Sequence, residues 1–209
     1  SINLICGGAG SGKTTFAIQF LMEGLKKGES GIYITFEEKK EKLYDDMAEF
    51  GWDLEKYERL GLFRFLEYTP EQIKRVLVEG GGTIDAIITQ LRAKRMVIDS
   101  ITSFALLFRD ELTQKESSLA LFELINRWGC TAVLTSQAIQ LSPEELTAQL
   151  QFEVDSILLF YHFKKKGMRG RAVEILKMRG TKTSDKTVKL EINAKQGVLV
   201  YPEETIEAM

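Results

Sequence analysis

The fold is decided by the stretch Gly7-Gly8-Ala9-Gly10-Ser11-Gly12-Lys13-Thr14, which satisfies the pattern G-x-x-x-x-G-K-[ST] in full. An apolar run typical of a buried strand, Ile2–Cys6, precedes this stretch. The residues after it, Thr14–Lys27, have the apolar spacing of an amphipathic helix. Strand, glycine-rich turn and helix in this order predict a loop whose backbone N–H groups converge on a phosphate.

The expected occupant of this loop is the polyphosphate tail of ATP or ADP, together with Mg²⁺. Lys13 would reach the β- and γ-phosphates as a point charge, and the Thr14 hydroxyl would be a ligand of Mg²⁺. The alternative is a glycine-rich turn without a ligand. It is disfavoured because a lysine beside the positive end of a helix needs an anion nearby. The predicted nucleotide-binding residues of the loop are Gly8, Ala9, Gly10, Ser11, Gly12, Lys13, Thr14 and Thr15.

Outward from this motif, apolar strands alternate with helices as far as Gln137. Strands that are apolar throughout suit a parallel sheet covered by helices on both faces. Beyond about residue 154 the strands follow one another with turns between them, which predicts an antiparallel extension over about 154–201. The predicted fold class is therefore α/β, with a mostly parallel sheet covered by helices and an antiparallel C-terminal extension.

Length and composition narrow the class of protein further. A chain of 209 residues fits one domain spanning 1–209. The 28 basic and 30 acidic side chains give a net charge of −2, which argues against coating nucleic acid by bulk charge. Cys6 and Cys130 lie in apolar runs and are expected to be buried thiols in a reducing compartment. No apolar run approaches ~20 residues, so we expect no membrane span and a cytoplasmic protein. The abrupt start at Ser1 suggests that a segment precedes it.

Further candidate residues stand at predicted strand ends. Asp99 follows the apolar run Met96–Ile98, at the edge where open α/β sheets bind ligands, and is expected to hold Mg²⁺ with Thr14. The alternative role for Asp99 is the N-cap of a following helix. Glu37 and Glu38 end another strand. One of them, Glu37 by preference, would activate water for attack on the γ-phosphate. Their alternative role is to stabilise the first turn of the next helix.

Several motifs beyond the phosphate loop recur in the order and spacing of a known family. With them the chain resembles the RecA-type ATPases, and within those the KaiC-like proteins. The late Lys-x-Arg-Gly-Thr block is the most specific, since few phosphate-loop families carry it on a hairpin. The matching motifs are Phe36-Glu37-Glu38, Phe50-Gly51-Trp52-Asp53-Leu54, Val97-Ile98-Asp99-Ser100 and Glu174-Ile175-Leu176-Lys177-Met178-Arg179-Gly180-Thr181.

The resemblance implies a homo-oligomeric ring, usually a hexamer, with ATP at each subunit interface. By that likeness Lys177, Met178 and Arg179 reach the nucleotide of the neighbouring subunit, where an arginine stabilises transition-state charge. From the residues alone, the favoured interpretation is different: these charges would protect an exposed edge strand from pairing. Other positions matched to nucleotide contacts in the family are Arg171, Thr181, Glu49 and Phe50.

The chain departs from the family pattern in three places. Thr183 stands where the family has a histidine that contacts nucleotide. The clock members of the family carry two copies of the domain, and one is present here. Gln151-Phe152 replaces their phosphorylatable Ser-Thr pair, so timekeeping by autophosphorylation at that place is not supported.

The remaining polar candidates are weaker. Gln137 ends a strand beside the predicted phosphate site and is either a γ-phosphate sensor or an ordinary strand end. His162 is expected to be a strand residue, not a ligand. The run from Lys164 to Arg171 is the one basic cluster, either a solvated turn or a contact for a phosphate backbone. We therefore carry three functions: a KaiC-like ATPase, a DNA-handling RecA-type ATPase, and a slow nucleotide-sensing scaffold that recruits protein partners.

Overall fold

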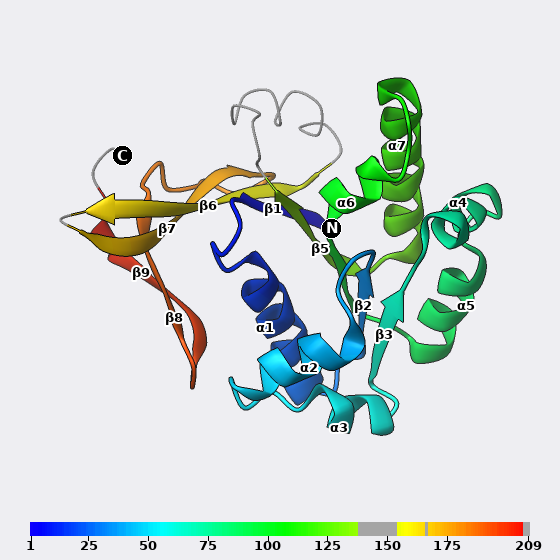
Figure 1. The fold of residues 1–209 in the computed structure, drawn as a ribbon, viewed down its shortest axis with the longest axis horizontal. Coiled ribbons are helices and arrows are strands. Elements are labelled where there is room, and N and C mark those ends of the chain that lie inside the picture. Colours follow the sequence, from blue (N-terminus) through cyan, green and yellow to red (C-terminus); the bar gives the residue numbers. More distant parts are fainter. Residues whose placement is uncertain (138–153, 166, 207–209) are drawn as a thin grey trace.

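The computed structural model describes residues 1–137, 154–165 and 167–206. These residues form one nine-stranded sheet in the order β3-β2-β4-β5-β1-β6-β7-β8-β9, flanked by helices (Figure 1). Six neighbouring strands, from β3 to β6, run parallel. Their bounds are Ile2–Gly7 (β1), Gly31–Thr35 (β2), Phe63–Glu67 (β3), Arg95–Asp99 (β4), Thr131–Gln137 (β5) and Ser156–Lys165 (β6).

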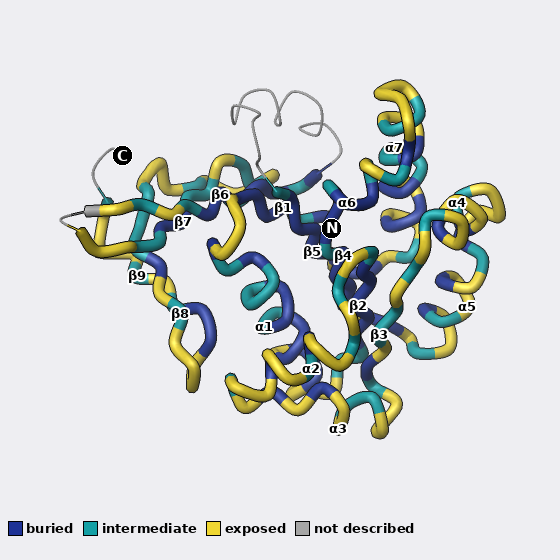
Figure 2. Tube along the Cα trace, viewed as in Figure 1, coloured by how far each residue is buried: buried dark blue, intermediate teal, exposed yellow. Residues whose placement is uncertain are grey.

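Both faces of the central strands β1, β2 and β4 are buried, which explains why these sequences are largely apolar (Figure 2). Along β1, Leu4 and Cys6 belong to one core cluster and Ile5 to the other. Along β2 the same alternation places Ile32 and Ile34 in the first cluster and Tyr33 in the second. The expectation of a covered parallel sheet is confirmed, and it positions the ends of β1, β4 and β5 at one edge.

The helices divide between these two cores. Buried side chains of α1, α2 and α3 belong to one cluster, and those of α4 to α7 belong to the other. Local signals set several boundaries: Thr69 and Gln72 form a capping box on α4, and Gly129 adopts a left-handed conformation at the end of α7. The bounds are Lys13–Lys26 (α1), Lys40–Ala48 (α2), Leu54–Arg59 (α3), Pro70–Val78 (α4), Gly82–Leu91 (α5), Ile101–Leu106 (α6) and Glu111–Trp128 (α7).

The C-terminal extension is antiparallel from β7 onward. It comprises Met168–Met178 (β7), Val188–Asn193 (β8) and Gly197–Thr205 (β9). Its first predicted strand, β6, pairs in parallel with β1 as well as antiparallel with β7, so β6 completes the parallel part. The ladder between β6 and β7 also shifts register: Leu158 pairs with Ile175 and Ile157 with Lys177, which leaves Leu176 as an extra residue in β7.

The start of α7 and the end of β2 complete the element boundaries. Helix α7 begins at Glu111 because the Asp110 carboxylate caps it by accepting a hydrogen bond from the Thr113 N–H. Strand β2 ends at Thr35, so Glu37 and Glu38 lie beyond it. None of the helices in the described ranges has the length and apolar character needed to cross a bilayer.

Candidate nucleotide-binding site

The predicted phosphate loop folds as a turn between β1 and α1, and glycine is required at several of its positions. A Cβ on Gly7 would lie 2.5 Å from the Phe160 carbonyl oxygen of β6. Gly10 and Gly12 have φ angles of 73° and 104°, which L side chains rarely adopt. The turn is therefore shaped by close backbone approach and left-handed conformations, as a loop of converging N–H groups requires.

Lys13, the first residue of α1, folds back over this turn. Its Nζ donates hydrogen bonds to the carbonyl oxygens of Gly7 and Gly8, each at 2.9 Å, and the residue is only 8% exposed. Burial lowers the pKa of Lys13 below its ordinary value, and the negative charge of Asp99 opposes that shift. This buried ammonium group, held against the backbone of the loop, supplies a positive charge that can pair with a polyphosphate.

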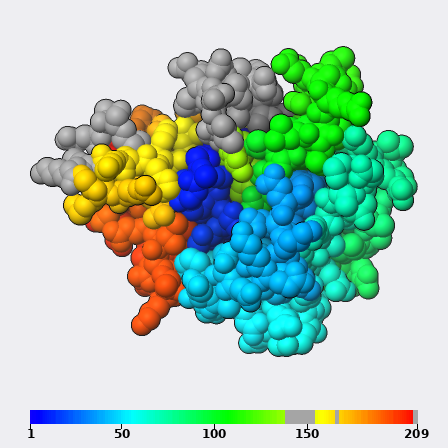
Figure 3. Space-filling model, viewed as in Figure 1, coloured from blue at the N-terminus to red at the C-terminus, as the bar shows by residue number. Residues whose placement is uncertain are grey.

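The loop also contains a polar atom that fits a ligand oxygen. Ser11 Oγ is buried and, within the described part of the chain, forms no hydrogen bond. Buried polar atoms usually have a hydrogen-bond partner. Gly8, Ala9 and Gly10 of the loop are exposed. The N-terminal part of the chain, which includes the loop, reaches the surface as dark blue between light blue and yellow segments (Figure 3). The residues present therefore fit a phosphate group that approaches from solvent.

Asp99, at the end of β4, lies directly beside the loop. Its Oδ2 accepts hydrogen bonds from Thr14 Oγ1 at 2.7 Å and from the Tyr33 hydroxyl at 2.9 Å, and its Oδ1 accepts one from Thr135. The alternative role for Asp99 is wrong, because Ser100 is the N-cap of α6 and accepts from the Ser103 N–H. The two predicted metal ligands, Thr14 and Asp99, are thus in contact with each other.

This pair fits Mg²⁺ better than a metal held by the protein alone. In the described ranges no group of three or more His, Cys, Asp or Glu side chains is arranged to hold a metal ion. Mg²⁺ typically takes one or two carboxylates and completes its coordination with waters and substrate phosphates. One hydroxyl and one carboxylate beside a phosphate loop match that donor set.

The two candidate bases, Glu37 and Glu38, lie beyond β2 and do not end a strand as expected. The N–H groups of Glu37 and Glu38 both donate to Thr35 Oγ1, at 3.2 and 3.0 Å, which bends the chain out of β2. Glu38 lines a cavity with Thr14 and lies 3.7 Å from the Lys42 ammonium. Glu37 is exposed and is not among the lining residues. The preference for Glu37 therefore gains no support from the geometry, and Glu38 lies nearer the loop.

That cavity adjoins the helix that follows the phosphate loop. It has a volume of about 340 Å³ and is lined by residues of α1 and of the α2 region, among them Thr15, Glu49 and Phe50. The Phe50 ring stacks on Trp52 with centroids 5.0 Å apart. The structure thus brings Glu49 and Phe50, which the resemblance matches to nucleotide contacts, to the same cavity as Thr14 and Thr15.

The antiparallel extension reaches the other side of the loop. Arg171 of β7 donates from Nε to the Gly10 carbonyl oxygen at 3.1 Å. His162 is a β6 residue as expected, yet a Cβ on Gly10 would lie 3.3 Å from its Cε1. Burial and the charges of Arg171 and Arg169 lower the pKa of His162. Sequence reasoning missed this neighbour of the loop. The parallel pairing of Gly7 with Phe160 is the signal that would have placed it there.

Gln137 ends β5 beside the loop, since its register partner on β1 is Gly7. Its N–H donates to Thr102 Oγ1 at 2.9 Å, and the same hydroxyl lies 3.1 Å from Ser136 Oγ. Thr102 of α6 therefore fixes the strand end that carries the candidate sensor.

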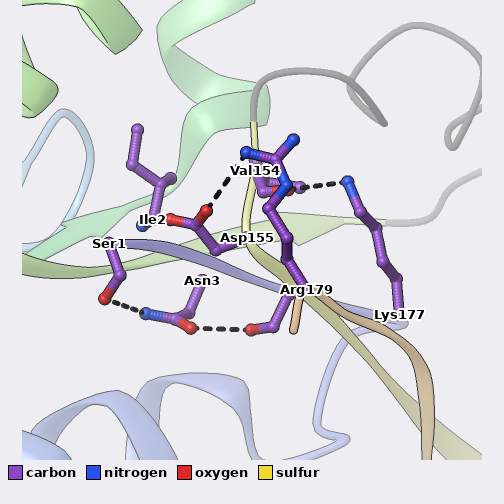
Figure 4. A network of polar contacts seen from close by, with 8 residues as sticks. Ser1, Ile2, Asn3, Val154, Asp155, Lys177 and Arg179 are labelled. Carbon is purple, nitrogen blue, oxygen red and sulfur yellow. Dashed lines mark hydrogen bonds and ion pairs between the residues drawn. The ribbon is translucent and has the colours of Figure 1, made fainter. Parts of the chain in front are cut away.

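Lys177, Met178 and Arg179 lie away from this chain's own loop, near the start of β1. The Thr181 N–H donates to the Met178 carbonyl oxygen at 3.4 Å. Lys177 Nζ donates to the Val154 carbonyl oxygen at 2.8 Å, and Arg179 Nη1 lies 3.4 Å from Asp155 Oδ1 (Figure 4). Both contacts are beside the first residues of β1, whereas the loop follows its last. Gln151-Phe152, the positions that depart from the family, lie outside the described residues.

Comparison with known proteins agrees with this architecture. A family model described as "ATPase: KaiC" matches residues 1–205. The circadian clock protein KaiC3 of Synechocystis is 31% identical over 98% of this chain, which spans 42% of that protein's length. A UPF0273 protein of Pyrococcus horikoshii is 31% identical, with 99% of this chain and 88% of that protein covered.

A solved structure gives the same answer in three dimensions. The crystal structure of the KaiC-like protein PH0186 from Pyrococcus horikoshii superposes with a TM-score of 0.84 at 35% identity. The match covers 97% of this chain and 89% of the other. The predicted RecA-like fold is therefore confirmed, and the chain belongs to the KaiC ATPase family.

Proposed function

We propose that the protein is an Mg²⁺-dependent ATPase that assembles into a ring, with each active site shared between adjacent subunits. The observation that carries this proposal is the loop itself. Lys13 Nζ is held on the Gly7 and Gly8 carbonyl oxygens, next to the contact between Thr14 and Asp99. Binding of ATP with Mg²⁺ requires a cation, a loop of backbone N–H groups, and a hydroxyl and a carboxylate for the metal.

Each of these groups has a definite task. Lys13 would exchange its carbonyl contacts for the β- and γ-phosphate oxygens, and the loop N–H groups would hold the same phosphates. Thr14 and Asp99 would hold Mg²⁺, which when bound offsets the charge that develops on the phosphates. Glu38, or Glu37 beside it, would orient and deprotonate the attacking water.

The shared site is inferred from the position of Lys177 and Arg179. Their contacts lie at the start of β1, while the loop of the same chain lies at its end. Cations so far from their own loop can serve a nucleotide only if that nucleotide belongs to another subunit. A guanidinium supplied in this way stabilises the transition state, an effect worth about 10³–10⁵ in turnover.

The test is ATP binding and hydrolysis by the purified protein and two lysine variants. Lys13→Ala should abolish ATP binding, because the loop loses its buried charge. Lys26→Ala is the matched control: Lys26 ends the same helix, half exposed and paired with Glu23, and its loss should leave binding unchanged. ATP affinity in Lys13→Ala equal to that of wild type would contradict the proposal.

Two comparisons separate the other functions. Chelation of Mg²⁺ should stop turnover, and a turnover too slow to measure in the assembled protein would favour a nucleotide-sensing scaffold.

The second candidate function is a DNA-handling ATPase, because the basic residues Lys164 and Arg169 lie near the β6–β7 turn. That candidate requires salt-sensitive binding of single-stranded DNA, lost in Lys164→Ala/Arg169→Ala, and stimulation of hydrolysis by DNA.

A further inference from the structure

Asp155, just before β6, is bonded to both the start of β1 and the end of β7. On the β1 side its N–H donates to the Ile2 carbonyl oxygen at 2.8 Å, and its Oδ2 accepts from the Ile2 N–H at 2.8 Å. On the β7 side its carbonyl oxygen accepts from the Arg179 N–H at 2.7 Å, and its Oδ1 lies 3.4 Å from Arg179 Nη1. Backbone and carboxylate of one residue therefore tie Arg179 to the first residue of β1 (Figure 4).

The carboxylate of Asp155 also acts on a second cation. Lys177 stands two residues before Arg179 and donates to the carbonyl oxygen of Val154, the neighbour of Asp155. Burial lowers the pKa of Lys177, the charge of Arg179 lowers it further, and the charge of Asp155 raises it. Two neighbouring cations repel each other unless an anion stands near them. Asp155 supplies that anion within the single subunit.

We propose that Asp155 is a positioning residue for Arg179. The contact with Asp155 holds the Arg179 guanidinium in one orientation, in which it faces the nucleotide of the neighbouring subunit. This inference rests on the proposed function, because it assumes that Arg179 acts on a neighbour. A group that is already oriented does not have to be reorganised when the charge develops, and misplacement by about 1 Å can cost up to about 100-fold in rate.

The hydrogen bonds between Asp155 and Ile2 fix the orientation of Arg179 relative to β1. β1 is buried at the centre of the sheet, its first residue holds Asp155, and its last is Gly7 of the phosphate loop. Asp155 itself is partly accessible, with its side chain 35% exposed and that of Arg179 57% exposed. The pair is thus anchored to β1 and is partly accessible to solvent.

The experiment is a double-mutant cycle between Asp155 and Arg179, measured as kcat, KM for ATP and ATP affinity. Asp155→Asn keeps the size of the side chain and an oxygen for the Ile2 N–H but removes the negative charge. We expect kcat to fall by up to about 100-fold with ATP affinity unchanged. In an Arg179→Ala background the same substitution should have no further effect, because the group that it positions is gone.

The matched control is Ser156→Ala. Ser156 neighbours Asp155 in the chain and bonds to Asn3 of β1 at 2.7 Å, outside the Arg179 contact. Ser156→Ala should keep the kcat of wild type. That result would show that loss of a contact to the start of β1 does not by itself lower kcat. Asp155→Glu, which restores the charge on a longer side chain, should recover part of the loss and serves if Asp155→Asn does not fold.

Three outcomes would overturn the proposal: an unchanged kcat in Asp155→Asn, an equal further loss in the Arg179→Ala background, or a loss of ATP affinity together with kcat. The failure of the proposed function looks different. If Arg179→Ala alone leaves kcat unchanged, the shared site is wrong. If Arg179→Ala lowers kcat and Asp155→Asn does not, only the positioning role is wrong.

Discussion

The two ends of β1 make different use of the same sheet. At the Gly7 end, the charged and polar groups are packed against one another within one chain: Lys13 is 8% exposed and Asp99 accepts from three hydroxyl groups. At the Ile2 end, Arg179 and Asp155 form an ion pair open to solvent. This difference supports the proposal that the Gly7 end binds phosphate with groups of its own chain, whereas the Ile2 end acts on a neighbouring subunit.

The proposed division of roles between the two ends can be tested with two variants, each damaged at one end, that are then mixed. Lys13→Ala spoils the loop end, and Arg179→Ala spoils the opposite end, lowering turnover by about 10³-fold or more while ATP still binds. Mixed rings would contain sites with an intact loop from one variant and an intact arginine from the other. Turnover of the mixture should therefore exceed that of either variant alone. Turnover no greater than the average of the two would show that Arg179 serves its own subunit.

A second test asks which of the two glutamates, Glu37 or Glu38, is the general base. Glu38→Gln should lower kcat by about 10²–10⁴-fold, the usual range for loss of a general base, because Glu38 lines the cavity beside Thr14. Glu37→Gln is the matched control and should change kcat much less. Steady-state kinetics with ATP affinity measured in parallel provide the test, and the reverse order of effects would identify Glu37 as the base.

A single methyl group tests how tightly each end is packed. Gly7→Ala places a Cβ 2.5 Å from the Phe160 carbonyl oxygen, so it should lower the free energy of unfolding by about 1–3 kcal/mol and weaken ATP binding. Gly180→Ala, beside Arg179, meets nothing within 4 Å and is strained only by its φ of 73°. It should cost about 1 kcal/mol and leave ATP affinity intact. Denaturant unfolding and ATP titration of both variants decide between packing and strain.

The smallest effect concerns the thiols, one near each end. Burial raises the pKa of Cys6 to about 12, with Lys13 opposing the shift, and burial also raises the pKa of Cys130. The thiolate is the reactive form, so both cysteines should resist alkylation at pH 8 and react only when the protein unfolds. Alkylation followed by mass spectrometry, with and without denaturant, checks this. Rapid labelling of Cys6 in the folded protein would mean that the loop end opens.

The sequence predicted most of what depends on neighbours along the chain. The G-x-x-x-x-G-K-T stretch located the loop, the apolar runs located the parallel strands, and the strand-end rule brought Asp99 to Thr14. These signals can be read from the sequence because each lies within one helix, strand or loop, or directly at its end. The late motif indicated Lys177 and Arg179 only through resemblance to a family.

What could not be predicted depends on pairing between distant segments. His162 approaches Gly10, and Thr102 holds Gln137, only because particular strands and helices become neighbours in the folded sheet. Asp155 meets Ile2 across most of the length of the chain. The glutamate pair was misplaced for a smaller reason: the Thr35 hydroxyl caps two N–H groups and ends the alternation that a strand would have given.

The extra residue in β7, Leu176, has a consequence for which way the late cations point. Side chains alternate between the two faces of a strand, so one inserted residue reverses the facing of everything after it. Lys177 follows Leu176 directly, whereas Arg171 precedes it on the same strand. If Leu176 took a regular place in the ladder, it would lie opposite Ile157 and Lys177 would lie opposite Ser156, with its side chain on the other face of the sheet. The face on which Lys177 lies is therefore set by a single irregular position.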